Sequence, residues 1–267
     1  MNPVLPPTET PQVSVVVPVY RNAATVQELH RRLRRVLQTQ GLEYELIFVE
    51  DACPDGSLEP LIALAEEDPR VGVLSLARNV GQHRAVLAGL AHARGRKIVV
   101  MDADLQDPPE AIPVLLARLG DGYSAAFAGK HGEYEPPARL LTGRAFKALL
   151  QLLCGVPADA GMYFAIDRRM AEQLLAFHAP APYLVAMIGC AGLPLASAPV
   201  RRARRPSGRS AYNTWKRLKI GVTAIAWTLA WKWLPGARRA SQPRAGVPLK
   251  AAYGVRFTPA PMRSGER

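Results

Sequence analysis

Residues 97–110 have the sequence KIVVMDADLQDPPE, which places a short apolar stretch directly before two carboxylates and a pair of prolines. Residues 97–101 are typical of a buried strand because apolar and β-branched side chains follow one another without a turn residue. Pro108 and Pro109 suit the first turn of a helix, which we expect to run to residue 119. The stretch therefore predicts a strand, an acidic loop and a helix in succession.

The same alternation of strand and helix extends towards the N-terminus. Strands are expected at residues 13–19, 45–49 and 71–76, and helices at residues 22–39, 58–65 and 82–93. Strands that alternate with helices over about 120 residues predict an α/β fold with a mostly parallel sheet. Beyond residue 120 the pattern is looser, with a strand expected at 123–129 and helices within 138–153, 165–177 and 212–234.

The acidic loop after residue 101 is a candidate metal site. Asp102 and Asp104 are one residue apart, so both can face one cation, and Gln106 offers a further oxygen. Such oxygen ligands suit Mg²⁺ or Mn²⁺, which keep open positions for a substrate diphosphate. Asp51 ends an earlier strand, and ligands of parallel sheets bind outside the carboxyl ends of the strands. These observations indicate a nucleotide or phosphate site with a metal. The alternative is that the acids merely end a strand and cap the next helix.

Composition narrows the class of protein. The chain has 267 residues, of which 49% are hydrophobic and 21% charged, as in globular proteins. Cys53, Cys154 and Cys190 are far apart, which fits a reduced cytoplasmic protein and argues against a disulfide scaffold or a cysteine-rich zinc site. The N-terminus lacks the features of a signal peptide, and no uninterrupted apolar window is long enough to predict a membrane span.

Charge is distributed unevenly along the chain. Residues 1–200 hold 18 Lys and Arg against 21 Asp and Glu, whereas residues 201–267 hold 16 against one. A strongly basic quarter indicates an anionic surface, such as nucleic acid, acidic lipid headgroups or a phosphorylated substrate. We expect a flexible segment at 1–10, a main domain at 11–210, an amphipathic helix at 211–236 and a basic, largely disordered tail at 237–267.

Five motifs follow one another in a fixed order. They are SVVVPVY at 14–20, FVEDACPDGS at 48–57, RNVGQ at 78–82, MDADLQDPPE at 101–110 and DAG at 159–161. Together they resemble the family 2 glycosyltransferases of GT-A fold, and most of all the polyprenyl-phosphate sugar transferases that include dolichyl-phosphate mannose synthase. The resemblance covers residues 13 to about 215 and implies a Rossmann-like, mostly parallel sheet flanked by helices.

The resemblance also implies a nucleotide-sugar site. The residues that it places around a UDP- or GDP-sugar are Pro18, Tyr20, Glu50, Asp51, Arg78 and Asp102. The ligands that it implies for Mg²⁺ or Mn²⁺ are Asp102, Asp104 and Gln106. The metal would neutralise charge that develops on the departing nucleoside diphosphate. The catalytic residues would then be Asp102, Asp104 and Asp159.

Asp159 matches a family position near the acceptor. It could act as a general base towards a hydroxyl acceptor, whereas an ionised phosphate acceptor needs no base; the alternative is a loop Asp that caps the following helix. Lys130, Arg202 and Arg205 are the residues implied to meet phosphate, with a solvated basic loop as the alternative for the two arginines.

Two departures from the family pattern concern the acceptor side. Ala211 stands where the family has Lys, and Phe164 stands where it has Arg, so positive charge is lost at both positions. The nucleotide-sugar donor is therefore indicated more firmly than the polyprenyl-phosphate acceptor.

The apolar stretch 220–234 is too short for a comfortable membrane span, and Lys232 interrupts it. Trp227 and Trp231 with flanking Lys and Arg favour a helix in the lipid headgroup region, and packing on the catalytic domain is the alternative.

The sequence predicts a metal-dependent, inverting glycosyltransferase. It would move a sugar from a UDP- or GDP-sugar to a polyprenyl-phosphate or lipid-linked acceptor, in cell-envelope glycan synthesis. It would be cytoplasmic and peripheral on the inner face of the cell membrane. One alternative is transfer to a saccharide or other hydroxyl acceptor, with Asp159 as the base. A less favoured one is a non-catalytic membrane or nucleic-acid binding protein, since no nucleic-acid motif is present.

Overall fold

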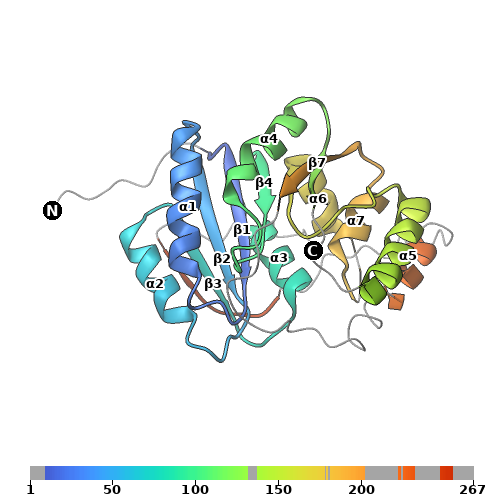
Figure 1. Ribbon diagram of the computed structural model, residues 1–267. Helices are drawn as coiled ribbons and strands as arrows, with labels where there is room; N and C mark the ends of the chain where they lie inside the picture. The colour runs from blue at the N-terminus through green and yellow to red at the C-terminus, as the bar shows by residue number, and fades with distance from the viewer. Residues whose placement is uncertain are drawn as a thin grey trace, which may run out of the picture.

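The computed structural model describes residues 10–131, 137–177, 179, 181–201, 222–223, 225–231 and 247–254. In these ranges the chain forms an eight-stranded sheet with the order β7-β5-β6-β4-β1-β2-β3-β8 (Figure 1). The strands are β1 (Val13–Val19), β2 (Tyr44–Glu50), β3 (Val71–Leu76), β4 (Lys97–Val100), β5 (Ala125–His131), β6 (Phe164–Asp167), β7 (Leu195–Arg201) and β8 (Leu249–Tyr253).

Helices cover both faces of this sheet. They are α1 (Val26–Thr39), α2 (Leu58–Glu67), α3 (Gln82–His92), the 3₁₀ turn η1 (Pro109–Ala111), α4 (Ile112–Gly120), α5 (Pro137–Cys154), α6 (Arg168–Ala176) and α7 (Leu184–Cys190). Buried side chains of α1, α2 and α4 pack in one core with Val15 and Val17 of β1. Those of α3, α6 and α7 pack in a second core with Val16. Two cores form because successive strand residues point to opposite faces, which also explains why the central strands are apolar throughout.

The directions of the strands bring most of their carboxyl ends to one edge of the sheet. β4, β1, β2 and β3 are mutually parallel. β6 is antiparallel to β4 and to β5, and β7 is parallel to β5, so β5 and β7 run in the same direction as the central strands. The carboxyl ends of six strands and the start of β6 therefore meet at one edge, called here the carboxyl edge. The expectation of an α/β, mostly parallel sheet is confirmed.

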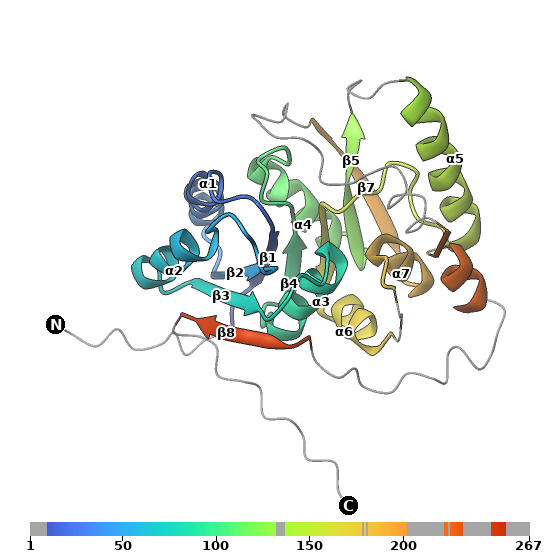
Figure 2. The ribbon, with the colours of Figure 1, turned by 90° about the horizontal axis from the view of Figure 1, so that it is seen from below.

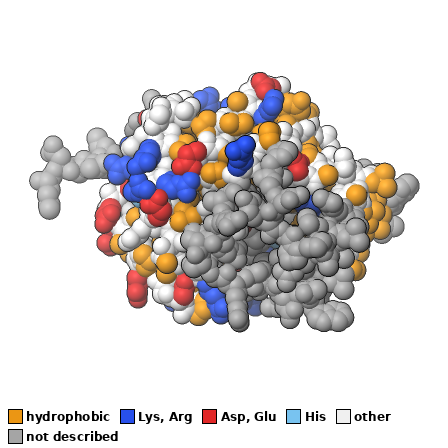
Figure 3. Space-filling model, viewed as in Figure 1, with side chains coloured by type: hydrophobic (Ala, Val, Ile, Leu, Met, Phe, Trp, Pro, Cys, Tyr) orange, Lys and Arg blue, Asp and Glu red, His pale blue; other side chains and the backbone are white. Residues whose placement is uncertain are grey.

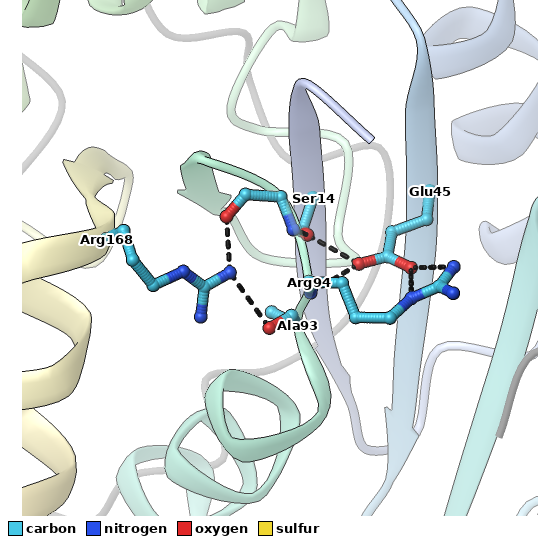
Figure 4. A network of polar contacts seen from close by, with 6 residues as sticks. Ser14, Glu45, Ala93, Arg94 and Arg168 are labelled. Carbon is cyan, nitrogen blue, oxygen red and sulfur yellow. Dashed lines mark hydrogen bonds and ion pairs between the residues drawn. The ribbon is translucent and has the colours of Figure 1, made fainter. Parts of the chain in front are cut away.

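A polar network ties elements together near the amino ends of the central strands (Figure 4). The buried Glu45 carboxylate accepts from the Ser14 hydroxyl at 2.6 Å and from the Arg94 guanidinium at 2.8 Å. Arg168, the first residue of α6, donates to the backbone carbonyls of Ala93 and Gly95. Because its charge is paired and its oxygens accept several bonds, Glu45 can be buried here at low cost.

The C-terminal part differs from the sequence expectation in two ways. Within residues 237–267, for which the sequence predicts a largely disordered tail, residues 249–253 form β8 antiparallel to β3. Residues 225–231 are helical as expected, but the rings of Trp227 and Trp231 lie 5.9 and 4.5 Å from the Phe177 ring, centroid to centroid. The two tryptophans thus pack on the protein, and the expectation that they face lipid headgroups is not met in this structure.

Candidate functional site at the carboxyl edge

The carboxyl edge gathers the loops that hold most of the predicted site residues (Figure 2). The loops that follow β1, β2, β3 and β4 emerge there, and residues 159–163 reach the same edge because Phe164 of β6 pairs with Val100 of β4. Strand–helix alternation explains this, since each parallel strand must end at the edge opposite its start. The sequence motifs are therefore brought together by topology, although they are spread over more than half of the chain.

Asp51 holds the loop that connects β3 to α3. Its carboxylate accepts from the backbone N–H of Val80 at 2.7 Å and of Gly81 at 2.9 Å. Asn79 donates from its side chain to the Asp51 carbonyl at 3.1 Å. Burial raises the pKa of Asp51 above its ordinary value, although the two backbone N–H groups oppose that shift. Asn79 thereby ties the loop after β3 to the backbone at the end of β2.

Glu50 is buried and accepts hydrogen bonds from neighbouring groups of the protein. Its carboxylate accepts from the Ser75 hydroxyl at 2.8 Å and from the backbone N–H of Cys53. Burial also raises the pKa of the Cys53 thiol to about 12, so this cysteine stays protonated at neutral pH. The contacts of Glu50 are thus structural, and any direct contact with a nucleoside stays a prediction.

The acidic loop is shaped by its own side chains. The Asp104 carboxylate accepts from the backbone N–H of Gln106 at 3.1 Å, and the Asp102 carboxylate accepts from the side-chain amide of Gln82. Asp102, Asp104 and Gln106 are each half-buried. The N-cap residues of η1 and α4 are Pro108 and Ala111, and neither makes a side-chain cap bond. The described residues contain no cluster of three or more His, Cys, Asp or Glu that could hold a metal.

Two short links join neighbouring loops of the site. The Thr25 hydroxyl donates to the Ala103 carbonyl at 2.6 Å, which fastens the β1–α1 loop to the acidic loop. The backbone N–H of Ala23 donates to the Asp55 carboxylate at 3.2 Å, which fastens the same loop to the one after β2. The β1–α1 loop is therefore hydrogen-bonded both to the acidic loop and to the loop after β2.

Backbone strain is concentrated in the same loops. Among the described residues, the non-glycine positions with left-handed φ are Arg21 (61°), Ala52 (48°) and Leu105 (60°). They lie in the loops after β1, β2 and β4 respectively, all at the carboxyl edge. Side chains disfavour this backbone region, and such residues cluster at functional sites because the surroundings can impose strain there.

Asp159 is anchored between β5 and β7. Its carboxylate accepts from the Ser197 hydroxyl at 2.7 Å. A Cβ on Gly129 of β5 would overlap the Asp159 carboxylate and would lie 2.6 Å from the Ser197 oxygen, so only glycine fits there. The element that follows Asp159 is strand β6, not a helix, so the capping alternative is wrong.

The remaining predicted residues lie as follows. Pro18 is buried within β1, and Tyr20 is half-buried with the Arg21 guanidinium 5.4 Å from the centre of its ring. Arg78 is exposed just after β3, and Lys130 belongs to β5 next to Gly129. Arg202 and Arg205 lie outside the described residues.

Three polar residues of the site were not singled out as functional by the sequence. Gln82 contacts Asp102, Ser197 contacts Asp159, and His83 accepts from the backbone N–H of Leu184 at 3.4 Å. Burial lowers the pKa of His83 to about 4, so it is neutral at physiological pH. Gln82 ends the RNVGQ motif and could have been found there, whereas Ser197 carries no motif signal.

The fold is an open α/β sheet, a class in which ligands bind outside the carboxyl ends of the strands, where the acidic loops of this chain lie. The sequence model of Glycosyl transferase family 2 matches residues 14–175. The uncharacterized glycosyltransferase YkcC of Bacillus subtilis (strain 168) is 32% identical over 217 residues, which are 80% of this chain and 67% of that protein. The chain belongs to glycosyltransferase family 2.

Solved structures share the fold at lower sequence identity. Mannosyl-3-phosphoglycerate synthase from Rubrobacter xylanophilus matches with a TM-score of 0.61 and 19% identity, over 89% of this chain and 79% of that one. The mannosyltransferase PcManGT from Pyrobaculum calidifontis, in complex with GDP-Man and Mn²⁺, matches with a TM-score of 0.57 and 21% identity, over 89% and 67%.

A third structure is glucosyl-3-phosphoglycerate synthase from Mycobacterium tuberculosis, in complex with Mn²⁺, UDP and phosphoglyceric acid. It matches with a TM-score of 0.60 and 22% identity, over 84% of this chain and 80% of that one. These similarities confirm the predicted GT-A class of α/β fold.

Proposed function

We propose that this glycosyltransferase moves a sugar from a UDP- or GDP-sugar to a polyprenyl-phosphate or lipid-linked acceptor, with inversion at the anomeric carbon and with the help of Mg²⁺ or Mn²⁺. The observation that supports this most directly is the carboxyl edge, where the loops of Asp51, Asp102, Asp104 and Asp159 meet. Inversion follows from a single in-line attack, in which the acceptor oxygen bonds to the anomeric carbon as the bond to the diphosphate breaks.

The donor set of the acidic loop fits a divalent cation. Asp102, Asp104 and Gln106 offer carboxylate and amide oxygens, which Mg²⁺ and Mn²⁺ prefer. Such ions are often bound by one or two carboxylates together with substrate phosphates, so the lack of a larger acidic cluster among the described residues agrees with this type of site. A bound ion would supply positive charge to the diphosphate that leaves.

The donor's nucleoside would lie between the loops after β1 and β2. Tyr20 is half-buried there, and Asp51 shapes the wall by holding Val80 and Gly81. A nucleotide-sugar donor is in line with the structural neighbours, since the mannosyltransferase PcManGT carries GDP-Man and the mycobacterial enzyme carries UDP.

Exposed apolar side chains and a basic segment support a lipid-linked acceptor. Apolar side chains gather over α5 (Figure 3), where Leu152 is 78% and Leu149 is 36% exposed. Residues 201–239 hold 11 Lys and Arg and no acid, which would favour an anionic membrane surface. Among the described residues, no helix combines the length and the apolar character that crossing a bilayer requires.

The second candidate is transfer to a hydroxyl acceptor, with Asp159 as general base. The specific observation in its favour is that Asp159 is fixed between β5 and β7 by Ser197 and by the space left at Gly129. A base must be held in position to accept a proton during the reaction, and this anchoring would do so.

A donor and acceptor panel tests both candidates. The purified protein is incubated with UDP- and GDP-sugars and Mn²⁺ or Mg²⁺, and release of nucleoside diphosphate is measured with polyprenyl phosphate, with a saccharide or with 3-phosphoglycerate. Stimulation by polyprenyl phosphate alone supports the first candidate, and stimulation by a hydroxyl acceptor supports the second.

The matched variants are Asp104→Asn in the acidic loop and Asp121→Asn, an exposed position after α4. We expect Asp104→Asn to lose metal-dependent turnover and Asp121→Asn to retain it. Full activity of Asp104→Asn at saturating donor would contradict the metal assignment.

A further inference from the structure

Gln82 makes a contact that joins two motifs of the site. It is the first residue of α3, and its side-chain amide donates to Oδ1 of Asp102, twenty residues further along the chain. Both side chains are half-buried at the carboxyl edge. The bond therefore connects the loop after β3 directly to the acidic loop after β4.

The chemistry of an amide suits this position. Gln is a neutral donor, so it can fix the direction of a carboxylate without cancelling its negative charge. A Lys or Arg at the same place would form an ion pair with Asp102 and would compete with a cation for the carboxylate. The contact thus orients Asp102 and preserves its ability to attract a positive ion.

The backbone of Gln82 is held on both sides. Before it, Val80 and Gly81 donate to the Asp51 carboxylate, and Gly81 has a φ of 85° that favours glycine. After it, the His83 ring packs edge-on against Tyr183 with 5.0 Å between ring centres. The first turn of α3 is fixed, so the amide of Gln82 approaches Asp102 from a defined direction.

We propose that Gln82 is a positioning residue that orients the Asp102 carboxylate for the metal and the donor diphosphate. The inference rests on the proposed function, because that function is what assigns Asp102 to the metal and the donor. Residues that hold a metal ligand through hydrogen bonds typically change metal affinity or activity by about 10–100-fold when they are replaced.

The test measures Mn²⁺ binding as well as turnover. Gln82→Met keeps the length of the side chain and removes the donor, and Gln82→Ala removes both. Gln38→Ala, at an exposed position near the end of α1, is the matched control. Free Mn²⁺ is followed by electron paramagnetic resonance during titration in the presence of GDP or UDP, and thermal unfolding is recorded for every variant.

We expect both Gln82 variants to bind Mn²⁺ about tenfold more weakly than the wild type, with kcat reduced and the unfolding midpoint close to that of Gln38→Ala. Wild-type Mn²⁺ affinity in Gln82→Met would overturn the inference, and so would a loss matched by a similar loss in Gln38→Ala. If Gln82→Ala unfolds, Gln82→Met still decides the question because it preserves packing volume.

Asp102→Asn separates failure of this inference from failure of the proposed function. Weak Mn²⁺ binding in Asp102→Asn together with normal binding in Gln82→Met rejects only the role of Gln82. Normal Mn²⁺ binding in Asp102→Asn rejects the metal role of Asp102 itself, on which the inference depends.

Discussion

The carboxylates at the carboxyl edge divide into two groups by what they contact. Glu50 accepts a hydrogen bond from the backbone N–H of Cys53 in its own loop, and Asp51 accepts from those of Val80 and Gly81 in the loop after β3. Asp102 and Asp104 are half-buried in the acidic loop, where a cation can reach them. A buried carboxylate that binds backbone N–H groups is costly to replace, since its donors lose their partner.

Asp51→Asn should destabilise the loop after β3. The amide has one acceptor oxygen in place of two, so Val80 or Gly81 would lose its partner, at a cost of about 1–3 kcal/mol in unfolding free energy. Because the same loop leads into Gln82, we also expect weaker binding of nucleoside diphosphate. Urea unfolding and calorimetric titration measure the two effects. Unchanged stability and an unchanged dissociation constant would contradict a role of Asp51 in stabilising the loop after β3 and in supporting nucleoside diphosphate binding.

Gly129→Ala should displace Asp159. The added methyl group would overlap the Asp159 carboxylate and approach the Ser197 hydroxyl, and overpacking of this kind costs about 1–3 kcal/mol. If Asp159 is the base, turnover with a hydroxyl acceptor should fall while turnover with a phosphate acceptor is retained. Gly120→Ala is the control, because nothing lies within 4 Å of the position that its methyl group would occupy. Equal losses with both acceptors would contradict a role for Asp159 as base.

The sequence predicts which residues lie at the site, but it does not predict the hydrogen-bond partners that fix their side chains. Asp51 and Asp102 follow apolar strands, so the pattern of parallel strands places them at the carboxyl edge. Their partners Val80 and Gln82 come from another strand–helix unit, and only the packed sheet brings these units together. Ser197 lies in β7, whose run of small residues and proline (LASAPVR) has no clear alternation of apolar and polar residues and so did not predict a strand.

At the scale of elements, the first turn of α3 contacts several other elements of the fold. Its residues contact the acidic loop through Gln82 and the start of α7 through His83. Tyr183 continues this contact to α5, since its ring lies 5.8 Å from that of Phe146, centre to centre. Helices α5 and α7 are thus connected to the first turn of α3 by packed side chains.

The unfolding free energy should depend on pH through His83. Its folded pKa of about 4 is below the ordinary 6.5, so between these values the unfolded chain takes up a proton that the folded chain does not. Stability from neutral His83 is therefore complete above about pH 6.5 and is lost as the pH falls towards 4. At about 1.4 kcal/mol for each pKa unit, the loss should reach a few kcal/mol.

Denaturant unfolding between pH 4 and 7 measures this dependence. In His83→Gln we expect a flatter curve over the same range, because the side chain no longer titrates. Parallel curves for the wild type and His83→Gln would mean that the folded protein binds the proton as readily as the unfolded chain.

At the scale of the whole molecule, a mildly acidic body carries a strongly basic C-terminal quarter. On the body, Lys and Arg lie interleaved with Asp and Glu over α1 (Figure 3), as in the pairs Arg31–Glu28 and Arg32–Glu110. Such a surface is locally balanced in charge. Any attraction to an anionic bilayer would therefore come from the C-terminal quarter, at about 1 kcal/mol for each basic residue near the surface.

Attachment to membranes should be sensitive to salt. Trp227 and Trp231 pack on Phe177 and so contribute little apolar contact with lipid, which leaves electrostatic attraction as the main term. We expect flotation with anionic liposomes at low salt and its loss at about 1 M salt, where the Debye length is about 3 Å. Flotation that persists in high salt would show that apolar side chains, such as Leu152 of α5, enter the bilayer.

The short strand β8 also bears on how the protein behaves in concentrated solution. It lies along β3, and the backbone N–H of Ala77 donates to the Pro248 carbonyl at 3.0 Å just beyond the pairing. Without β8, the buried and almost wholly apolar strand β3 would present a free row of backbone donors and acceptors to other molecules. Exposed edges of this kind promote sheet-to-sheet aggregation, and β8 replaces this edge by a shorter strand that carries Lys250. We therefore expect substitutions that weaken the pairing of β8 with β3 to make the enzyme more prone to aggregation in concentrated solution.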